Sequence, residues 1–173
     1  MKVKEIIDMC LKKLGWEDLI DKETYTSDEQ KLIDRLVFNV NVVCREIATC
    51  YLNIIESRDI EVENGEYVFA NLTGVRLLYP VRLMVGNKEI AYKVYATKLK
   101  CDYSGKATLY YACLPSKEYT IDDEIGDTRI TLDALCAGAL SEYCLQNKDF
   151  YYARVYDSTF RTEMNAIKYG GKK

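Results

Sequence analysis

Hydrophobic residues recur at helical spacing over the first third of the chain. In residues 3–14 they follow one another at intervals of three and one, which is the spacing of a helix with one buried face. Gly15 is placed to end this helix. A second stripe, with intervals of three and four, predicts a long helix over about residues 28–56. Ser27 is its expected N-cap, and Gln30 stands three residues later, as in a capping box.

The hydrophobic period changes from that of a helix to that of a strand after residue 57. The Asn64-Gly65 pair lies between two short alternating runs, which is a strong signal for a two-residue hairpin. Residues 75–85 alternate in the same way. Pro80 lacks a backbone N–H, so this strand is predicted to lie at an edge or to be broken there. The Gly86-Asn87 pair provides the next expected turn, followed by two more alternating runs, residues 88–100 and 107–113.

Two more helices are predicted in the last quarter of the chain. The third begins at Thr131 or Asp133, and a short polar connection leads to the fourth, for which Asp149 is the expected N-cap. Such a short loop makes two helices antiparallel neighbours. Small residues at positions 137–139 would admit a close neighbour. The buried face of the fourth helix is predicted from residues at intervals of three and four, namely Tyr152, Tyr156, Phe160, Met164 and Ile167.

This order of elements predicts an α+β fold. We expect a helical bundle of about four helices, with an antiparallel β-meander inserted between helices two and three. One face of the meander is expected to be buried under the helices. The whole chain, 1–173, is predicted to form a single domain, with N-terminal helices in 1–57, the β insertion in 58–121, the helical hairpin in 128–168 and a flexible tail in 169–173.

The composition agrees with a soluble, folded protein. A chain of 173 residues that is 49% hydrophobic and 29% charged can bury a core of its own. No apolar run approaches the roughly 20 residues that span a bilayer. Glu5 and Asp8 interrupt the beginning of the chain, so we do not expect a signal peptide there. An intracellular protein with no membrane partner is expected.

The residue types give little support for catalysis or metal binding. The seven cysteines are odd in number, form no CxxC pair and are accompanied by no histidine, so we predict core thiols and no metal site. The absence of histidine also removes the common nucleophile–base pairs. No glycine-rich phosphate loop has the required spacing. We therefore expect no enzyme, no catalytic residue and no bound cofactor. The acidic segment 122–127 is interpreted as a solvated loop.

Charge is segregated along the chain. Residues 75–106 hold seven bases against two acids, whereas 17–34 and 118–127 are rich in acids. Three interpretations of the basic run stay open. It is a nucleic-acid surface, with lysines interleaved among tyrosines; or it is the polar face of a half-exposed sheet; or it is one of two complementary strips that meet between identical subunits.

The closing sequence, "LDALCAGALSEYCLQNKDFYYARVYDSTFRTEM", and the β insertion between early and late helices together resemble one family. They are similar to the head–tail connector (adaptor) proteins of tailed bacteriophages, which are related to tail accessory and tail tubular proteins of short-tailed phages. The resemblance covers about two thirds of the chain. In that family the last long helix carries an aromatic rhythm, matched here by Tyr151, Tyr152, Tyr156, Asp157, Phe160 and Met164.

The resemblance implies a structural virion protein, assembled in the host cytoplasm. Such proteins form a ring, commonly twelve-fold, that joins the portal to the tail and encloses the DNA passage without binding DNA specifically. The implied partners are further copies of the chain, the portal protein, and a tail protein or the next connector. Two alternatives remain: another tail-completion or tail structural protein, or a nucleic-acid-binding module that uses the basic, tyrosine-rich sheet face.

Three groups of residues are the candidate sites of assembly. The hairpin tip is expected to touch a neighbouring subunit or the next ring and comprises Gly86, Asn87 and Lys88. The C-terminal tail is expected to become ordered on the portal and includes Lys168, Tyr169, Lys172 and Lys173. The acidic loop is expected to face the lumen of the ring and contains Asp122, Asp123, Glu124 and Asp127.

Overall fold

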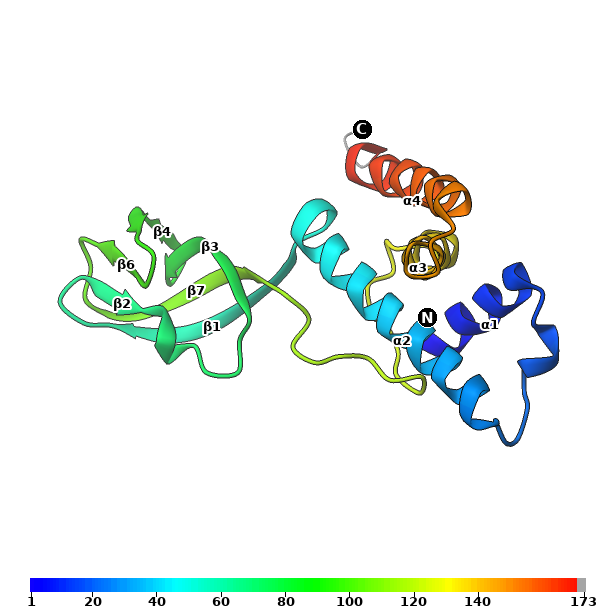
Figure 1. Cartoon of the computed structure of the whole chain (residues 1–173). Coiled ribbons are helices and arrows are strands. Elements are labelled where there is room, and N and C mark those ends of the chain that lie inside the picture. The colour runs from blue at the N-terminus through cyan, green and yellow to red at the C-terminus, as the bar shows by residue number, and fades with distance from the viewer. Residues whose placement is uncertain (171–173) are drawn as a thin grey trace. The chain divides into compact units, whose positions relative to one another are not determined.

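The computed structural model describes residues 1–170, which form two compact units (Figure 1). The helical unit consists of Met1–Ile47 and the chain from Lys117 onward, and the β unit consists of Ala48–Ser116. Within these described residues, four α-helices and two antiparallel sheets confirm the predicted α+β class. The β insertion is a compact unit with a hydrophobic core of its own, and the prediction of a single domain stays a prediction.

Helix α3 lies at the centre of the helical unit. It contacts the other three helices, and its residues from Ala134 to Ser141 are all buried. The long α4 runs alongside it (Figure 1). The four helices are α1 Val3–Leu14, α2 Ser27–Glu46, α3 Leu132–Gln146 and α4 Phe150–Gly170, with a short 3₁₀ turn at Glu17–Leu19 after α1.

The predicted ends of α1, α3 and α4 agree with the structure at three caps. Gly15 has a φ of 77° after α1, a left-handed conformation that glycine adopts without strain. The Thr131 hydroxyl accepts a hydrogen bond from the Ala134 backbone N–H at 3.1 Å and starts α3. Asp149 accepts from the Tyr152 backbone N–H at 3.3 Å and starts α4.

Helix α2 differs from its prediction at both ends. Its N-cap is Thr26, one residue earlier than Ser27, and the Glu29 carboxylate accepts from the Thr26 backbone N–H at 2.8 Å. Helix α2 ends at Glu46 and is followed by a π-helical turn, Ile47–Tyr51. The predicted end at residue 56 is wrong, because Ile54 already pairs with a strand partner.

Gly138 allows α3 to approach its neighbours closely. A Cβ atom at this position would lie 2.7 Å from Val43 Cγ1 on α2 and 3.3 Å from Phe160 Cδ2 on α4. Both distances are shorter than ordinary carbon–carbon contacts. The prediction that small residues at 137–139 admit a close neighbour is therefore confirmed at Gly138.

The buried face of α4 is only partly the predicted one. Phe160 and Met164 are buried as expected, together with Ala153, but Tyr152 is exposed. Helix α4 also continues beyond Ile167 and ends at Gly170. The prediction that a flexible tail begins at residue 169 is therefore wrong for its first two positions.

Seven strands form two antiparallel sheets in the β unit. The strands are β1 Ile54–Val62, β2 Glu66–Val68, β3 Leu77–Val85, β4 Lys88–Ile90, β5 Tyr92–Val94, β6 Lys98–Cys101 and β7 Gly105–Cys113, with a 3₁₀ turn at Phe69–Asn71. The larger sheet has the order β1-β7-β3-β4, and the smaller one has the order β2-β6-β5. The predicted single meander is thus wrong in detail: the run 88–100 contributes β4 to one sheet and β5 and β6 to the other.

The turns of the β unit agree with their sequence signals. Asn64 and Gly65 both have positive φ, 50° and 75°, as a two-residue type I′ hairpin requires. A Cβ atom at position 65 would lie 2.5 Å from the Cys101 carbonyl oxygen. At Pro80 the register of β3 against β7 shifts, and β4 pairs only with Leu83–Val85. The prediction that Pro80 marks a break in the ladder is confirmed.

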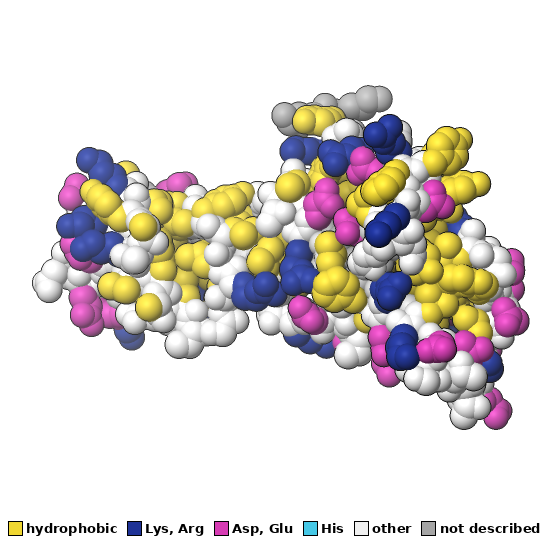
Figure 2. Space-filling view, in the orientation of Figure 1, with side chains coloured by type: hydrophobic (Ala, Val, Ile, Leu, Met, Phe, Trp, Pro, Cys, Tyr) yellow, Lys and Arg dark blue, Asp and Glu magenta, His cyan; other side chains and the backbone are white. Residues whose placement is uncertain are grey.

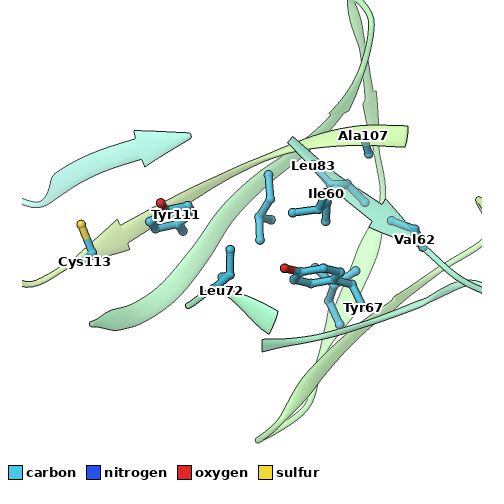
Figure 3. Packing of buried hydrophobic residues seen from close by; sticks show 10 residues of the cluster. Ile60, Val62, Tyr67, Leu72, Leu83, Ala107, Tyr111 and Cys113 are labelled. Atoms are coloured by element: carbon cyan, nitrogen blue, oxygen red, sulfur yellow. The ribbon is translucent and has the colours of Figure 1, made fainter. Parts of the chain in front are cut away.

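The core of the β unit lies between its own sheets and loops (Figure 3). Tyr111 and Leu83 come from the larger sheet, Tyr67 from the smaller sheet, and Leu72 from the loop before β3. Every member of this cluster belongs to residues 54–113. The expectation that helices cover the buried face of the sheet is replaced by packing of the two sheets on each other.

Candidate functional site

The described residues 1–170 bring no three His, Cys, Asp or Glu side chains together as ligands for a metal ion. Across the same residues, no helix is both long enough and apolar enough to pass through a bilayer. The features that invite a functional interpretation are surfaces: the acidic loop, the hairpin tip, and the exposed side of α4.

Five of the seven cysteines are buried, as predicted for core thiols. Cys10 on α1 and Cys136 on α3 are in contact, with 3.5 Å between their sulfur atoms. The contact with Cys136 and burial both raise the pKa of Cys10 well above its ordinary value. Burial also raises the pKa of Cys44 to about 12. The thiols of Cys10 and Cys44 are therefore protonated at neutral pH and poor nucleophiles. Cys50 is exposed and does not fit the prediction.

The acidic loop holds the beginning of α1. The Val3 backbone N–H donates to the Asp123 carbonyl oxygen at 3.0 Å, and the Lys4 N–H donates to the Ile121 carbonyl oxygen at 3.1 Å. These two donors lie in the first turn of α1, where no partner exists within the helix. The Met1 carbonyl in turn accepts from the Ile125 N–H at 2.8 Å. The loop is therefore a structural partner of the N-terminal helix.

Three of the four carboxylates in this loop are engaged in ion pairs within the chain. Asp123 pairs with Lys117, Glu124 pairs with the Met1 amino group at 3.0 Å, and Asp127 pairs with Arg129 at 2.6 Å. Asp122 is exposed. The expected acidic surface is thus smaller than its composition indicates, and the prediction that it faces a lumen rests mainly on Asp122.

Asp123 is the most strongly perturbed of these carboxyls. The Lys117 ammonium and hydrogen bonds from the backbone and hydroxyl of Thr120 lower the pKa of Asp123 from its ordinary value of 3.8 to about 2. The Thr120 N–H and hydroxyl donate at 2.7 and 2.9 Å. All of these partners favour the charged form, because each presents a positive charge or a donor.

We predict that strongly acidic pH loosens this loop. A depressed folded-state pKa contributes stability that is complete above the ordinary value near 3.8 and is lost as the pH falls through about 2. An NMR titration of the Asp123 carboxyl is expected to have its midpoint near 2. At neutral pH, Asp123→Asn is expected to speed amide exchange at Val3 and Lys4, whereas Asp122→Asn serves as the unaffected control. A titration midpoint near 3.8 would contradict the ion pair.

The hairpin tip is exposed, as predicted. Gly86, Asn87 and Lys88 are all exposed, and Lys88 pairs with Val85 at the closing position of the β3–β4 hairpin. Gly86 has a φ of 57°. The contact of this tip with another subunit stays a prediction.

The C-terminal candidates divide into two groups. Lys168 and Tyr169 lie in the last turn of α4, where Tyr169 is exposed and the Lys168 ammonium lies 5.8 Å from its ring centroid. Lys172 and Lys173 lie outside the described residues. Docking of this segment on a portal stays a prediction. Lys168 and Tyr169 would dock as part of helix α4 and not as part of a flexible tail.

The sequence analysis missed a large exposed hydrophobic surface at the beginning of α4. This surface, here called the α4 aromatic surface, comprises Leu145, Phe150, Tyr151, Tyr152 and Val155, each between 45% and 73% exposed. Figure 2 shows hydrophobic side chains gathered over this end of the helix. A groove on it is lined by Phe150, Tyr151, Arg154, Val155, Ser158 and Thr159. Contiguous exposed apolar patches of this kind mark sites of interaction.

A simple signal for this surface was present in the sequence. Phe150, Tyr151 and Tyr152 are consecutive, and consecutive residues on an α-helix point about 100° apart. They cannot all enter one buried face. The rings of Tyr151 and Tyr152 contact each other edge to face, with centroids 5.2 Å apart, so the surface is partly ordered by its own contacts.

Comparison with known proteins gives no family. No protein-family model matches the chain, and no curated protein is significantly similar to it.

Proposed function

We propose that the chain is a structural virion protein, a ring-forming head–tail connector that joins the portal to the tail and encloses the DNA passage. The observation that carries the proposal is the α4 aromatic surface. Five large apolar side chains exposed at one end of a helical hairpin are costly in water, and burial against a protein partner removes that cost. The aromatic rhythm of α4 that resembles connector proteins begins in the same stretch, at Tyr151.

The packing of α3 supports a role in rigid assembly. Its faces are buried against α1, α2 and α4. The exposed turn between α3 and α4 is held by backbone hydrogen bonds from Lys148 to Leu145 at 3.0 Å and from Asp149 to Cys144 at 2.9 Å. A surface on a rigid support loses little conformational entropy when it binds. Leu145 precedes this turn and Phe150 follows it, so both are presented in a fixed geometry.

DNA binding is the competing function, favoured by one local observation. The Lys100 ammonium lies 5.9 Å from the ring centroid of exposed Tyr95, and lysines beside aromatic rings are typical of single-strand binding surfaces. However, Glu66 forms ion pairs with both Lys98 and Lys100, at 2.7 and 2.5 Å. This carboxylate offsets part of the positive charge that phosphate binding needs. We therefore place DNA binding second.

The connector proposal is tested first by the mass of the assemblies. We expect native mass spectrometry of the purified chain, alone and mixed with candidate portal and tail proteins, to show a ring or a complex with a ring-shaped partner. Measurement of salt-dependent DNA binding runs in parallel. A monomer that ignores every virion partner and binds DNA at physiological ionic strength would overturn the connector in favour of the nucleic-acid module.

Disruption of the α4 aromatic surface is expected to abolish or strongly weaken assembly. Tyr151→Ser together with Phe150→Ser removes two apolar anchors, and central aromatic anchors commonly contribute 2 kcal/mol or more each, which is about a thirtyfold loss of affinity. Phe38→Ser on α2 is the matched control, because Phe38 is also exposed but lies outside the surface. Thermal unfolding checks that each variant stays folded. Unchanged assembly in the folded double variant would show that the surface is not an interface.

A further inference from the structure

The β unit carries opposite charges on opposite sides. Strand β1 and the turn after it present four exposed acids, Glu56, Asp59, Glu61 and Glu63, against one exposed base, Arg58. Strands β4 and β5 present two exposed bases, Lys88 and Lys93. We name these the acidic side and the basic side.

The order of the strands separates the two sides. In the larger sheet, β1 is one edge strand and β4 is the other. In the smaller sheet, β5 is an edge strand, and β2, which follows the acidic turn, is the opposite edge. Only Ala91 lies between β4 and β5, and the Glu63–Glu66 bridge joins the acidic turn to β2. The edge strands β1 and β2 therefore belong to the acidic side, and the edge strands β4 and β5 belong to the basic side.

These charges are largely unused within the chain. Among the described residues, no ion pair involves Asp59, Glu61, Glu63, Lys88 or Lys93. Asp59 accepts a hydrogen bond from the Thr108 hydroxyl at 2.7 Å. Glu61 has Lys106 opposite it in the register, and Glu89 is one acid on the basic side. The net sign of each side remains, because the acidic side has four acids against one base and the basic side has two bases against one acid.

Charged side chains on edge strands also protect sheets from unwanted pairing. That purpose is served best by charges of the same sign on both edges, because two copies would then repel each other in every orientation. Opposite signs on opposite edges have the reverse effect. They attract a second copy when the acidic side of one meets the basic side of the next.

We propose that the β units of neighbouring copies bind head to tail, with the acidic side of one copy against the basic side of the next. The inference rests on the proposed ring and specifies its contact. A head-to-tail interface uses two different patches of each subunit, and it generates a ring when the rotation closes. Lys88 in the hairpin tip is a member of the basic side, so the contact expected of that tip acquires a defined partner.

The test uses charge reversals on each side of the full-length chain. Lys88→Glu with Lys93→Glu reverses the basic side, and Glu61→Lys with Glu63→Lys reverses the acidic side. Each variant alone has two sides of the same sign and is expected to lose self-association by about 100-fold, since like charges brought together cost several kcal/mol. When the two variants are mixed, every contact again joins opposite signs, and mixed assemblies with alternating copies are expected.

Sedimentation velocity across a range of protein and salt concentrations gives the readout. The control, Lys12→Glu with Arg76→Glu, makes the same change in net charge as the basic-side reversal, at exposed positions outside both sides, and is expected to assemble as the wild type does. Wild-type assembly should also weaken as salt rises. If each of the two reversal variants forms rings by itself as readily as the wild type does, this inference alone is overturned. A wild-type chain that stays monomeric at every concentration and with portal would overturn both the inference and the proposed ring.

Discussion

Replacement of Gly138 by leucine is expected to unfold the helical unit. The Cβ atom alone would lie 2.7 and 2.9 Å from the two methyl carbons of Val43 and 3.3 Å from Phe160 Cδ2. Val43 and Phe160 are themselves buried, so neither can turn away into solvent. Leucine adds three further carbons at a point where α2, α3 and α4 already touch. Overpacking of a dense core costs about 1–3 kcal/mol for small insertions and more for large ones.

The smaller change, Gly138→Ala, isolates the contact. Alanine improves the helix propensity of α3 by about 1 kcal/mol, whereas the overlap with Val43 opposes it. We expect a net loss of about 1–2 kcal/mol in the free energy of unfolding. Urea unfolding, followed by the fluorescence of Trp16, measures this loss. Trp16 is the only tryptophan, and its ring centroid lies 6.1 Å from that of Tyr143 on α3.

Two further variants test whether the contact with Val43 causes this loss of stability. Gly138→Ala combined with Val43→Ala removes the methyl carbons that the new Cβ meets, so it is expected to lose less stability than the two single changes added together. Gly170→Ala places a Cβ where no atom lies within 4 Å and is expected to leave stability unchanged or slightly raised. If Gly138→Ala stabilises the protein by as much as helix propensity alone, the close approach of α2 and α3 is wrong.

Periodicity predicted the elements whose burial is one-sided. The stripe in residues 3–14 reproduces α1 from Val3 to Leu14, because α1 has one buried face and one solvated face. Helix α3 is buried on nearly all sides, so its hydrophobic pattern could not indicate which residues face which neighbour. Its small residues indicated the close approach, and Gly138 confirmed it.

The boundary between α2 and β1 could not be predicted from the local spacing of hydrophobic residues. Apolar residues continue at helical spacing through Ile54, yet Ile54 and Ile55 pair with Cys113 and Ala112 of β7. Their partners lie nearly 60 positions later, and tertiary pairing overrides a local preference of this size. The division of residues 88–100 between two sheets has the same cause, since alternation predicts strands but not which strand each one joins.

The candidate sites show the same limit. The exposure of Gly86, Asn87 and Lys88 followed from their turn signal. The role of the acidic loop did not, because Glu124 meets the amino group of Met1 at the other end of the chain. Composition indicates how many carboxylates a loop has, but long-range ion pairs decide how many of them remain available to a partner.

Truncation of Leu109 is expected to unfold most of the β unit while the helical unit stays folded. Leu109 is fully buried on β7, between Arg58 on β1 and Leu83 on β3 in the register. Leu→Ala at such a site costs about 2–5 kcal/mol. A unit of this size, Ala48–Ser116, seldom has more than about 3–5 kcal/mol of stability from its core alone. The variant is therefore expected to lose slow amide exchange throughout β1, β3 and β7.

The exposed Ile55 gives the matched control for Leu109→Ala. Ile55 lies on neighbouring β1 in the same sheet and is 48% exposed, so Ile55→Ala removes a similar aliphatic side chain without leaving a closed cavity. It should cost much less and leave exchange in β7 slow. In both variants the Trp16 unfolding transition should stay at its wild-type urea concentration, because every member of the β-unit core comes from residues 54–113. A parallel loss of the Trp16 transition in Leu109→Ala would show that the two units unfold as one and that the single domain predicted from the sequence describes their energetics correctly.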